Sequence, residues 1–150
     1  MRIPIIVALV ACANVAHAQA DPCSWLTPAQ LGKEFGGTFK PAEKTSAIPA
    51  YRGQNPGTRC VFSGPHTVML IVYVDKSAAE AKSTFESMMG SFYKVDSKPG
   101  GLGDEAYFDS GKGLHILKGK TRLFIDTGVS DKAKAHQNAT DLAQIALPNA

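Results

Sequence analysis

The residues whose spacing most suggests chemistry lie in a glycine-rich segment, residues 101–106, with the sequence GLGDEA. The letters match G-x-G-x-x-A, in which glycines let the backbone approach a dinucleotide pyrophosphate at a helix N-terminus. That site needs a buried strand before the glycines and a helix after them. Here Lys98-Pro99 comes before, and an Ala-Tyr-Phe strand follows. We therefore predict a tight turn, in which the glycines take positive φ and Asp104 bonds neighbouring backbone amides.

Histidine, serine and carboxylate side chains are the other candidates for catalysis or metal binding. Of the four histidines, His17 lies in the N-terminal segment that we expect to be removed. The other three lie in a predicted turn, strand and helix, without the i, i+4 or H-x-H spacing of a metal site: His66, His115 and His136. A Ser-His-Asp triad is assembled in space, but no serine lies in the G-x-S-x-G elbow of hydrolases. Asp104 and Glu105, with Asp109 nearby, could form an acid–base pair, yet adjacent loop carboxylates are usually solvated. We predict no catalytic residue, metal or cofactor, and expect the histidines at or near the surface.

The cysteines predict one disulfide bond. Of the three cysteines, Cys12 lies in the N-terminal segment that we expect to be removed. Cys23 and Cys60 remain, and an even pair in an oxidising compartment most simply forms a disulfide. Closing this loop stabilises the fold by roughly 4 kcal/mol in the chain-entropy model. Without a Cys-x-x-Cys motif or a nearby histidine, redox-active or metal-bound thiols are the weaker interpretation.

The first 20 residues have the features of a secretory signal peptide. Arg2 supplies a positive charge, residues 3–11 form an uncharged apolar run, and two A-x-A patterns end at Ala18 and Ala20. The apolar run is too short to span a bilayer, which takes roughly 20 residues. We expect cleavage after Ala20, or alternatively after Ala18, and a periplasmic or secreted mature protein. A buried N-terminal strand or helix is the less favoured interpretation.

A lipid anchor is the alternative outcome of export. Leu9-Val10-Ala11-Cys12 resembles a bacterial lipobox, in which the cysteine becomes the lipidated N-terminus. The apolar run before Cys12 is short for that route, so simple cleavage is the favoured prediction.

Size and charge restrict the class of protein. The chain has 150 residues, and residues 21–150 have the length of a single domain. The 16 Lys and Arg and 13 Asp and Glu give a net charge of +3, with both signs scattered along the chain. A nucleic-acid surface would concentrate its basic residues on one face, so no nucleic-acid partner is expected. We expect no transmembrane segment after the signal peptide.

Capping residues and apolar periodicity predict three helices. The first begins at Thr27 with Pro28 and a Gln30 capping box, and Gly36-Gly37 ends it. A Ser77–Glu80 capping box opens the second, which Gly90 ends. The third follows Ser130-Asp131 and stops at Pro148.

Strands fill the segments between the helices. The continuous apolar run 68–74 indicates a central strand, and alternating residues predict strands at 59–63, 106–108, 114–118 and 122–127. We predict a loop with at most one short strand in residues 39–57. Another strand could start within 92–95. The predicted fold is α+β, an antiparallel sheet with helices packed on one face, in the order α-β-β-α-β-β-β-α. The repeated strand–turn–strand–helix pattern suggests a weak internal duplication.

Three motifs together resemble a family of small exported bacterial proteins and lipoproteins of unknown function. They are the DPCSWLT start at residues 21–27, the RCVF segment at 59–62 and the GLGDEA segment at 101–106. The family starts near Asp-Pro-Cys-x-Leu-Leu-Thr and carries a Gly-x-Gly-Asp-x-Ala loop. This chain departs from the pattern at Trp25, where Leu is usual. The resemblance implies an exported α+β domain without established catalysis, and it supplies no active-site residues.

These observations predict a non-enzymatic exported module that binds an envelope protein or a small ligand. Loops on a rigid scaffold usually carry function, so we expect the contact region in two loops. Its candidate residues are Gly100, Gly101, Leu102, Gly103 and Asp104, together with Tyr51 and Arg52. An envelope hydrolase remains an alternative if His115, Asp104 or Asp109 meets a serine in a cleft. An enzyme inhibitor that inserts Tyr51-Arg52 into its target is another.

Overall fold

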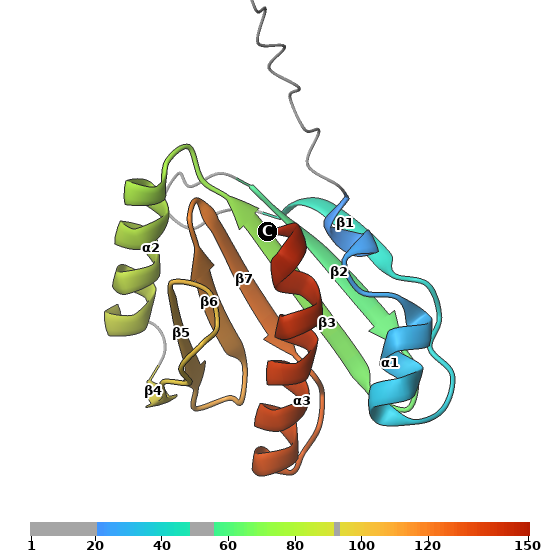
Figure 1. The fold of residues 1–150 in the computed structure, drawn as a ribbon. Coiled ribbons are helices and arrows are strands. Elements are labelled where there is room, and N and C mark those ends of the chain that lie inside the picture. Colours follow the sequence, from blue (N-terminus) through green and yellow to red (C-terminus); the bar gives the residue numbers. More distant parts are fainter. Residues whose placement is uncertain (1–20, 49–55, 92–93) are drawn as a thin grey trace, which may run out of the picture.

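The computed structural model describes residues 21–48, 56–91 and 94–150 (Figure 1). The predicted signal peptide, Cys12 and the Tyr51-Arg52 pair lie outside these residues. In chain order the elements are η1 (Pro22–Ser24), α1 (Pro28–Phe35), β1 (Glu43–Ile48), β2 (Gly57–Ser63), β3 (Thr67–Val74), α2 (Ala78–Ser91), β4 (Val95–Ser97), β5 (Glu105–Asp109), β6 (Leu114–Lys118), β7 (Thr121–Asp126), α3 (Lys132–Ala146) and η3 (Leu147–Asn149). Within the described part of the chain, no helix is long and apolar enough to span a membrane.

A seven-stranded antiparallel sheet, in the order β1-β2-β3-β7-β6-β5-β4, forms the centre of the domain. The predicted α+β class and the order of the three helices and five predicted strands are confirmed, and two further strands, β1 and β4, lie at the two edges of the sheet. Two meanders, β1-β2-β3 and β5-β6-β7, meet where β3 pairs with β7 over six residue pairs from Met69↔Asp126 to Val74↔Thr121. The apolar run 68–74 therefore occupies an inner strand, as its composition indicated.

The N-terminal segment is held by local caps and by a disulfide. The capping box between Thr27 and Gln30 forms as predicted, with Thr27 accepting from the Gln30 amide and the Gln30 side chain accepting from the Thr27 amide. The predicted disulfide joins Cys23 of η1 to Cys60 of β2, with their Cα atoms 5.3 Å apart. Trp25 and Leu26, buried beside it, belong to the main core.

The main core lies between one face of the sheet and helices α1 and α3. Side chains alternate between the two faces of a strand, so Leu70 of β3, Ile125 of β7 and Ile116 of β6 share this face. They pack against apolar residues of α1 and α3 such as Leu31 and Leu142. We call this the covered face of the sheet.

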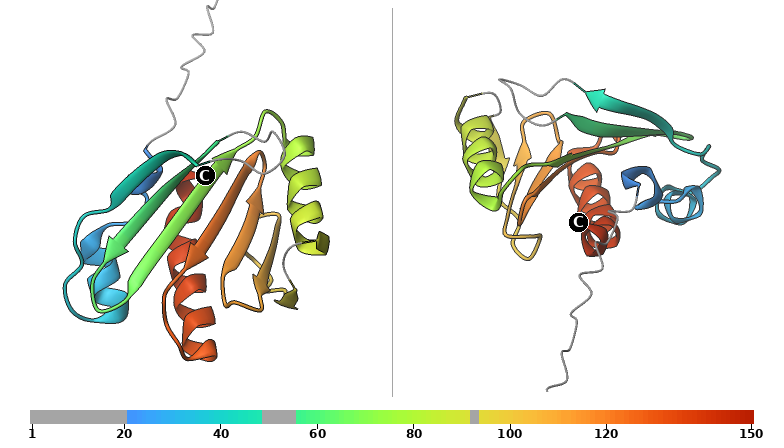
Figure 2. Two further views of the ribbon diagram at one scale, coloured as in Figure 1. Left: turned by 180° about the vertical axis from the view of Figure 1, so that it is seen from behind. Right: turned by 90° about the horizontal axis from the view of Figure 1, so that it is seen from above.

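Helix α2 differs from the prediction that the helices pack on one face. Its buried residues Ala81 and Phe85 contact Tyr107 of β5 and Leu117 of β6, which alternate with the core residues of those strands and point the other way. Seen from above, the sheet twists so strongly that α2 and α3 flank the β5–β6 end on opposite sides (Figure 2, right). Helical periodicity identifies an apolar stripe but does not say which face of a sheet receives it.

The suggested duplication is visible in the order of strands but not in the placement of helices. Each meander ends in a helix, α2 after β3 and α3 after β7. These two helices lie on opposite faces of the sheet, so the second half does not repeat the packing of the first.

Removing the disulfide should destabilise the domain. The double substitution Cys23→Ser with Cys60→Ser leaves the packing residues in place but frees the loop in the unfolded chain, so the melting temperature should fall by several degrees. Circular dichroism measures the shift, and thiol titration under denaturing conditions confirms that the wild-type protein has no free thiol from this pair. An unchanged melting temperature in the variant would contradict a stabilising role.

Candidate functional site

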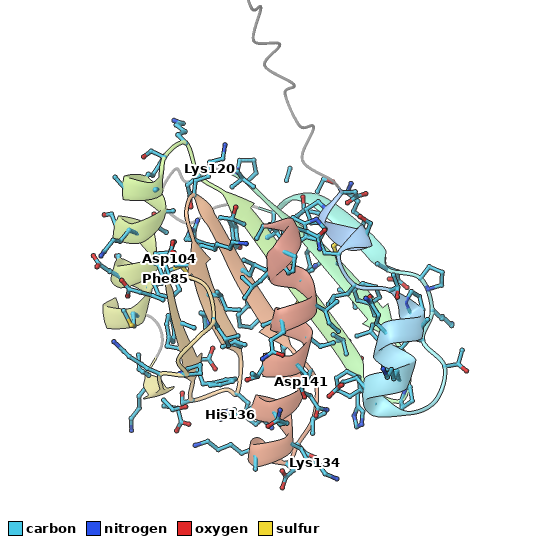
Figure 3. The ribbon with its side chains drawn as sticks, in the orientation of Figure 1. Phe85, Asp104, Lys120, Lys134, His136 and Asp141 are labelled. Carbon is cyan, nitrogen blue, oxygen red and sulfur yellow. A yellow bond between two sulfur atoms is a disulfide. The ribbon has the colours of Figure 1, made fainter. Side chains whose placement is uncertain are left out.

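The predicted binding loop, Gly100–Asp104, is joined to the end of β6 and to the β6–β7 turn through Asp104, and four of its five residues are exposed. Leu102 is buried, and the Asp104 amide donates to the Leu117 carbonyl over 2.7 Å. The Asp104 carboxylate, labelled in Figure 3, accepts a hydrogen bond of 2.6 Å from the Gly119 amide in the β6–β7 turn. The predicted positive φ is present at Gly101 and Gly103. The expectation that Asp104 bonds the amides of neighbouring residues is wrong, because the amide that donates to its carboxylate belongs to Gly119, 15 residues further along the chain.

His115 and Asp109 form a buried pair that the sequence did not indicate. The Nε2 atom of His115 lies 2.8 Å from an Asp109 carboxylate oxygen, and the Gly113 amide donates to the other oxygen over 2.9 Å. His115 is 3% exposed, so its expected surface position is wrong. The ring stacks on Tyr107 with centroids 4.5 Å apart. Burial alone would raise the pKa of Asp109, but the hydrogen bonds from His115 and Gly113 lower it overall.

The arrangement around His115 supports a structural role for this pair. The small crevice that His115 lines has a volume of about 20 Å³, close to the space of one water molecule. Its lining residues include no serine: Tyr73, Phe85, Met88, His115, Arg122, Leu123 and Phe124. Asp104 lies at the β6–β7 turn and Asp109 at the other end of β5. Among the described residues, no group of three or more His, Cys, Asp or Glu could hold a metal ion.

The other two histidines lie elsewhere. His136 of α3 stacks on Phe108 with ring centroids 3.7 Å apart, and burial lowers its pKa. His66, in the β2–β3 turn, lies beside Phe35 of α1 at 5.8 Å between centroids. The three described histidines therefore lie on three different elements, the β2–β3 turn, β6 and α3.

A second buried charged pair, Asp75 and Arg122, fixes the beginning of α2. Asp75 follows β3 directly, and its two carboxylate oxygens accept hydrogen bonds of 2.6 and 3.2 Å from the Arg122 guanidinium of β7. The side chains are 0% and 4% exposed. Arg122 also contacts Met88 of α2 and lies 4.7 Å from the Tyr73 ring centre. These contacts connect the central strand pair to α2.

Beside α2, the same face of the sheet carries half-buried apolar side chains, of which Tyr73 and Phe124 border α2 and the others have no described helix over them. We call this surface the open face and define it by Val61 of β2, Met69, Ile71 and Tyr73 of β3, and Phe124 of β7. The strand register places Ile71 opposite Phe124, and Phe124 opposite His115. This row runs from Phe124 outward to Ile71 of β3 and then to exposed Arg59 of β2, while Val61 and Met69 form the neighbouring apolar pair.

Two acidic residues flank the open face. Register pairs Glu43 of β1 with Val61, Val61 with Met69, and Met69 with Asp126 of β7. One row across four strands therefore reads acidic, apolar, apolar, acidic. Glu43 is exposed, and Asp126 is half-buried and accepts from the Gly128 amide over 2.9 Å.

A separate groove lies on the covered side, between the end of α1, the β2–β3 turn and the first half of α3. Its volume is about 180 Å³, and it combines apolar, acidic, basic and amide side chains: Glu34, Phe35, His66, Val129, Lys134 and Asn138. At its edge Glu34 forms a side-chain hydrogen bond with Asp141 of α3. Burial raises the pKa of Glu34, and the negative charge of Asp141 raises it further.

The sequence prediction missed both surfaces. The run 68–74 could have signalled the open face, because an antiparallel strand with one wet face usually alternates, whereas Met69, Ile71 and Tyr73 stay apolar on the outward side. The groove gave no comparable signal. Its residues come from three distant segments and are unremarkable in each of them.

Truncating one partner of the Asp75–Arg122 pair should strongly destabilise the domain. Arg122→Met leaves a buried carboxylate without its cation, and such a loss costs about 3–5 kcal/mol. Adding Asp75→Leu removes the orphaned charge, so the double variant should recover much of this loss. Urea unfolding of the four proteins gives the coupling energy. A single variant that unfolds like wild type would show that the pair contributes nothing.

The Asp109 carboxylate should make the domain lose stability at acid pH. Because folding lowers its pKa from 3.8, the ionised group stabilises the native state above that pH, and the contribution disappears as pH falls below it. The difference in unfolding free energy between wild type and Asp109→Asn should therefore be largest above pH ~5 and shrink towards pH ~2. Chemical unfolding at a series of pH values measures it. A difference that is constant with pH would contradict the assignment.

Comparison with known proteins adds no relative from which a role could be transferred. No protein-family model, curated protein or solved structure matches this chain. The resemblance to exported bacterial proteins therefore stays a prediction, and the candidate sites rest on the geometry of the open face and the groove.

Proposed function

We propose that this protein is a non-enzymatic module, exported to the periplasm or beyond, that binds a protein partner through the open face. The carrying observation is the row of apolar side chains, Val61, Met69 and Ile71 among them, which remain half-buried without a described helix over them. Contiguous exposed apolar surface is a feature of interaction sites. Tyr73 and Phe124 add the aromatic character that is enriched in interface cores.

The two acidic residues on the open face favour a partner that places basic groups opposite them. Glu43 and Asp126 lie at the two ends of the row that contains Val61 and Met69. In the next row, exposed Arg59 lies opposite Ile71, so the face carries charges of both signs. A partner that presents an apolar surface with Lys or Arg facing the two carboxylates would bury apolar area and form these ion pairs.

Export is supported by two independent features. The N-terminal residues have the order of charge, apolar run and small residues that signal peptidase substrates share. The Cys23–Cys60 disulfide suits an oxidising compartment. In the envelope or outside the cell, a domain of this size often acts by binding other proteins, and the buried positions of His115 and Asp109 leave them poorly placed for catalysis.

Site-specific crosslinking tests the proposed partner surface. A photoreactive amino acid at Met69 on the open face should capture a defined protein in the native envelope, whereas the same probe at exposed Gln144 of α3 should not. The captured protein is then purified, and its affinity for this domain is measured by calorimetry. Glu43→Lys should weaken binding several-fold, because it places a positive charge against the basic groups of the partner. Glu86→Lys on α2 is the matched control and should leave the affinity unchanged.

Three outcomes would contradict the proposal. Capture of the same proteins from both positions would mean that the open face is not selective. Capture of a second copy of this chain would make the surface a dimer interface, and capture of lipid would make it a membrane contact.

A further inference from the structure

The α1–α3 groove has the composition of a small-molecule site, and it is independent of the open face. Pockets for small ligands combine apolar walls with a few placed polar groups. This groove has Phe35 and Val129 as apolar walls, and Lys134, Asn138 and the Glu34–Asp141 pair as polar groups. Its volume of about 180 Å³ corresponds to about six water molecules at ~30 Å³ each. A ligand of that size is a small metabolite.

The polar groups are ordered along one face of α3. Lys134, Asn138 and Asp141 follow each other at spacings of four and three residues, which bring side chains to the same side of a helix. Figure 3 shows Lys134 near the beginning of α3 and Asp141 further along. Seven residues separate these two, about 10 Å along the helix axis at 1.5 Å per residue. The groove therefore has a basic end and an acidic end.

The acidic end holds two neighbouring carboxyl groups, Glu34 and Asp141. Asp141 accepts two hydrogen bonds of 3.0 Å from the Gln137 side chain on its own helix, which fixes its position. Glu34 of α1 lies beside it, and burial and the negative charge of Asp141 raise the pKa of Glu34. No ion pair joins Lys134 to either carboxylate within 4.0 Å in the described structure. An ammonium group placed between the two carboxylates could pair with both.

We propose that this groove binds a free α-amino acid with a short apolar side chain. Its ammonium group lies between Glu34 and Asp141, its carboxylate is directed towards Lys134, and its side chain packs against Phe35 and Val129. Asn138, between the two ends, can bond either polar group of the ligand. The zwitterion matches the charge order of the groove, and the hydrocarbon part matches its apolar wall.

The affinity for an ammonium group should depend on pH, because the ammonium pairs with ionised carboxylates. Burial and the negative charge of Asp141 raise the pKa of Glu34, so Glu34 takes up a proton as pH falls through the acid range, and that proton must leave before the ammonium can pair with it. The groups that face Glu34 from packed elements are Asp141 of α3 and Lys33 of α1, with His66 and Lys134 lining the same groove. The affinity should rise as pH rises through the acid range.

Calorimetry and NMR with L-leucine as the probe test the proposal on the mature protein. We expect binding in the millimolar range or tighter, with amide shifts confined to α1, the β2–β3 turn and the part of α3 from Lys134 to Asp141. Isoamylamine lacks the carboxylate and 4-methylpentanoate lacks the ammonium, so each should bind at least tenfold more weakly. L-leucinamide, which resembles the start of a peptide, should be weakened as well if the ligand is a free amino acid.

Substitutions at the acidic and basic ends of the groove test the roles of Glu34 and Lys134, and a substitution of Lys98 is the matched control. Glu34→Gln keeps the shape and a hydrogen bond to Asp141, yet it should reduce L-leucine affinity at least tenfold and abolish its pH dependence. Lys134→Met should reduce it by a similar factor, whereas Lys98→Met, in an exposed loop, should have no effect. Circular dichroism of each variant confirms that it is folded.

Several results would overturn the inference. They are no binding of L-leucine at tens of millimolar, binding that Glu34→Gln and Lys134→Met leave unchanged, or equal binding of isoamylamine and L-leucine. None of these results bears on the open face, so failure here and failure of the proposed protein partner are separable. Conversely, loss of partner binding in Glu43→Lys should leave L-leucine binding intact.

Discussion

The ion pair between Asp75 and Arg122 is the interaction on which the arrangement of this domain depends. It is almost completely buried, where each charge alone would carry a large desolvation cost. Two hydrogen bonds between guanidinium and carboxylate offset that cost, and the Asp75 amide also donates to the Lys120 carbonyl over 2.9 Å. Asp75 stands at the exit of β3, and Arg122 stands near the start of β7. The pair therefore fixes the central strand pairing and the point where α2 leaves the sheet.

The position of α2 divides the second face of the sheet, opposite the covered face, into two parts. The helix runs over β5 and β6, where Phe85 meets Tyr107 edge to face at 5.1 Å between ring centroids. It does not extend over β2 and β3. One half of this face is therefore a small second core, while the other half is the open face. The crevice lined by Tyr73, His115 and Arg122 marks the border between the two halves.

Local signals in the sequence predicted most of the fold. The Thr27 cap, the inner strand 68–74 and the Cys23–Cys60 pair depend on residues close in sequence or on simple pairing, and all three are confirmed. The side of the sheet chosen by α2 was not predictable, because it depends on a buried contact between residues 47 positions apart, Asp75 and Arg122.

The candidate sites were harder to predict than the fold. The glycine segment at 101–104 was a candidate site because its letters match a dinucleotide-binding motif. In the structure, hydrogen bonds of Asp104 join this segment to Leu117 and to Gly119 of the β6–β7 turn. Glu34 and Asp141 are ordinary helix residues in sequence, and only tertiary packing makes them neighbours. The His115–Asp109 pair spans a hairpin, and its burial follows from α2 lying on that face.

The disulfide also has a mechanical consequence. Cys23 lies two residues after Asp21, and its bond leads directly into β2 of the sheet. A tensile load applied at the N-terminal end of the domain would pass through the sulfur atoms into β2 and bypass the intervening chain, including α1 and β1. α1 and β1 would therefore remain folded, because the force reaches the sheet without passing through the chain that forms them. A domain tethered by its N-terminus would thus resist extension through β2, where hydrogen bonds to β1 and β3 on both sides share the force.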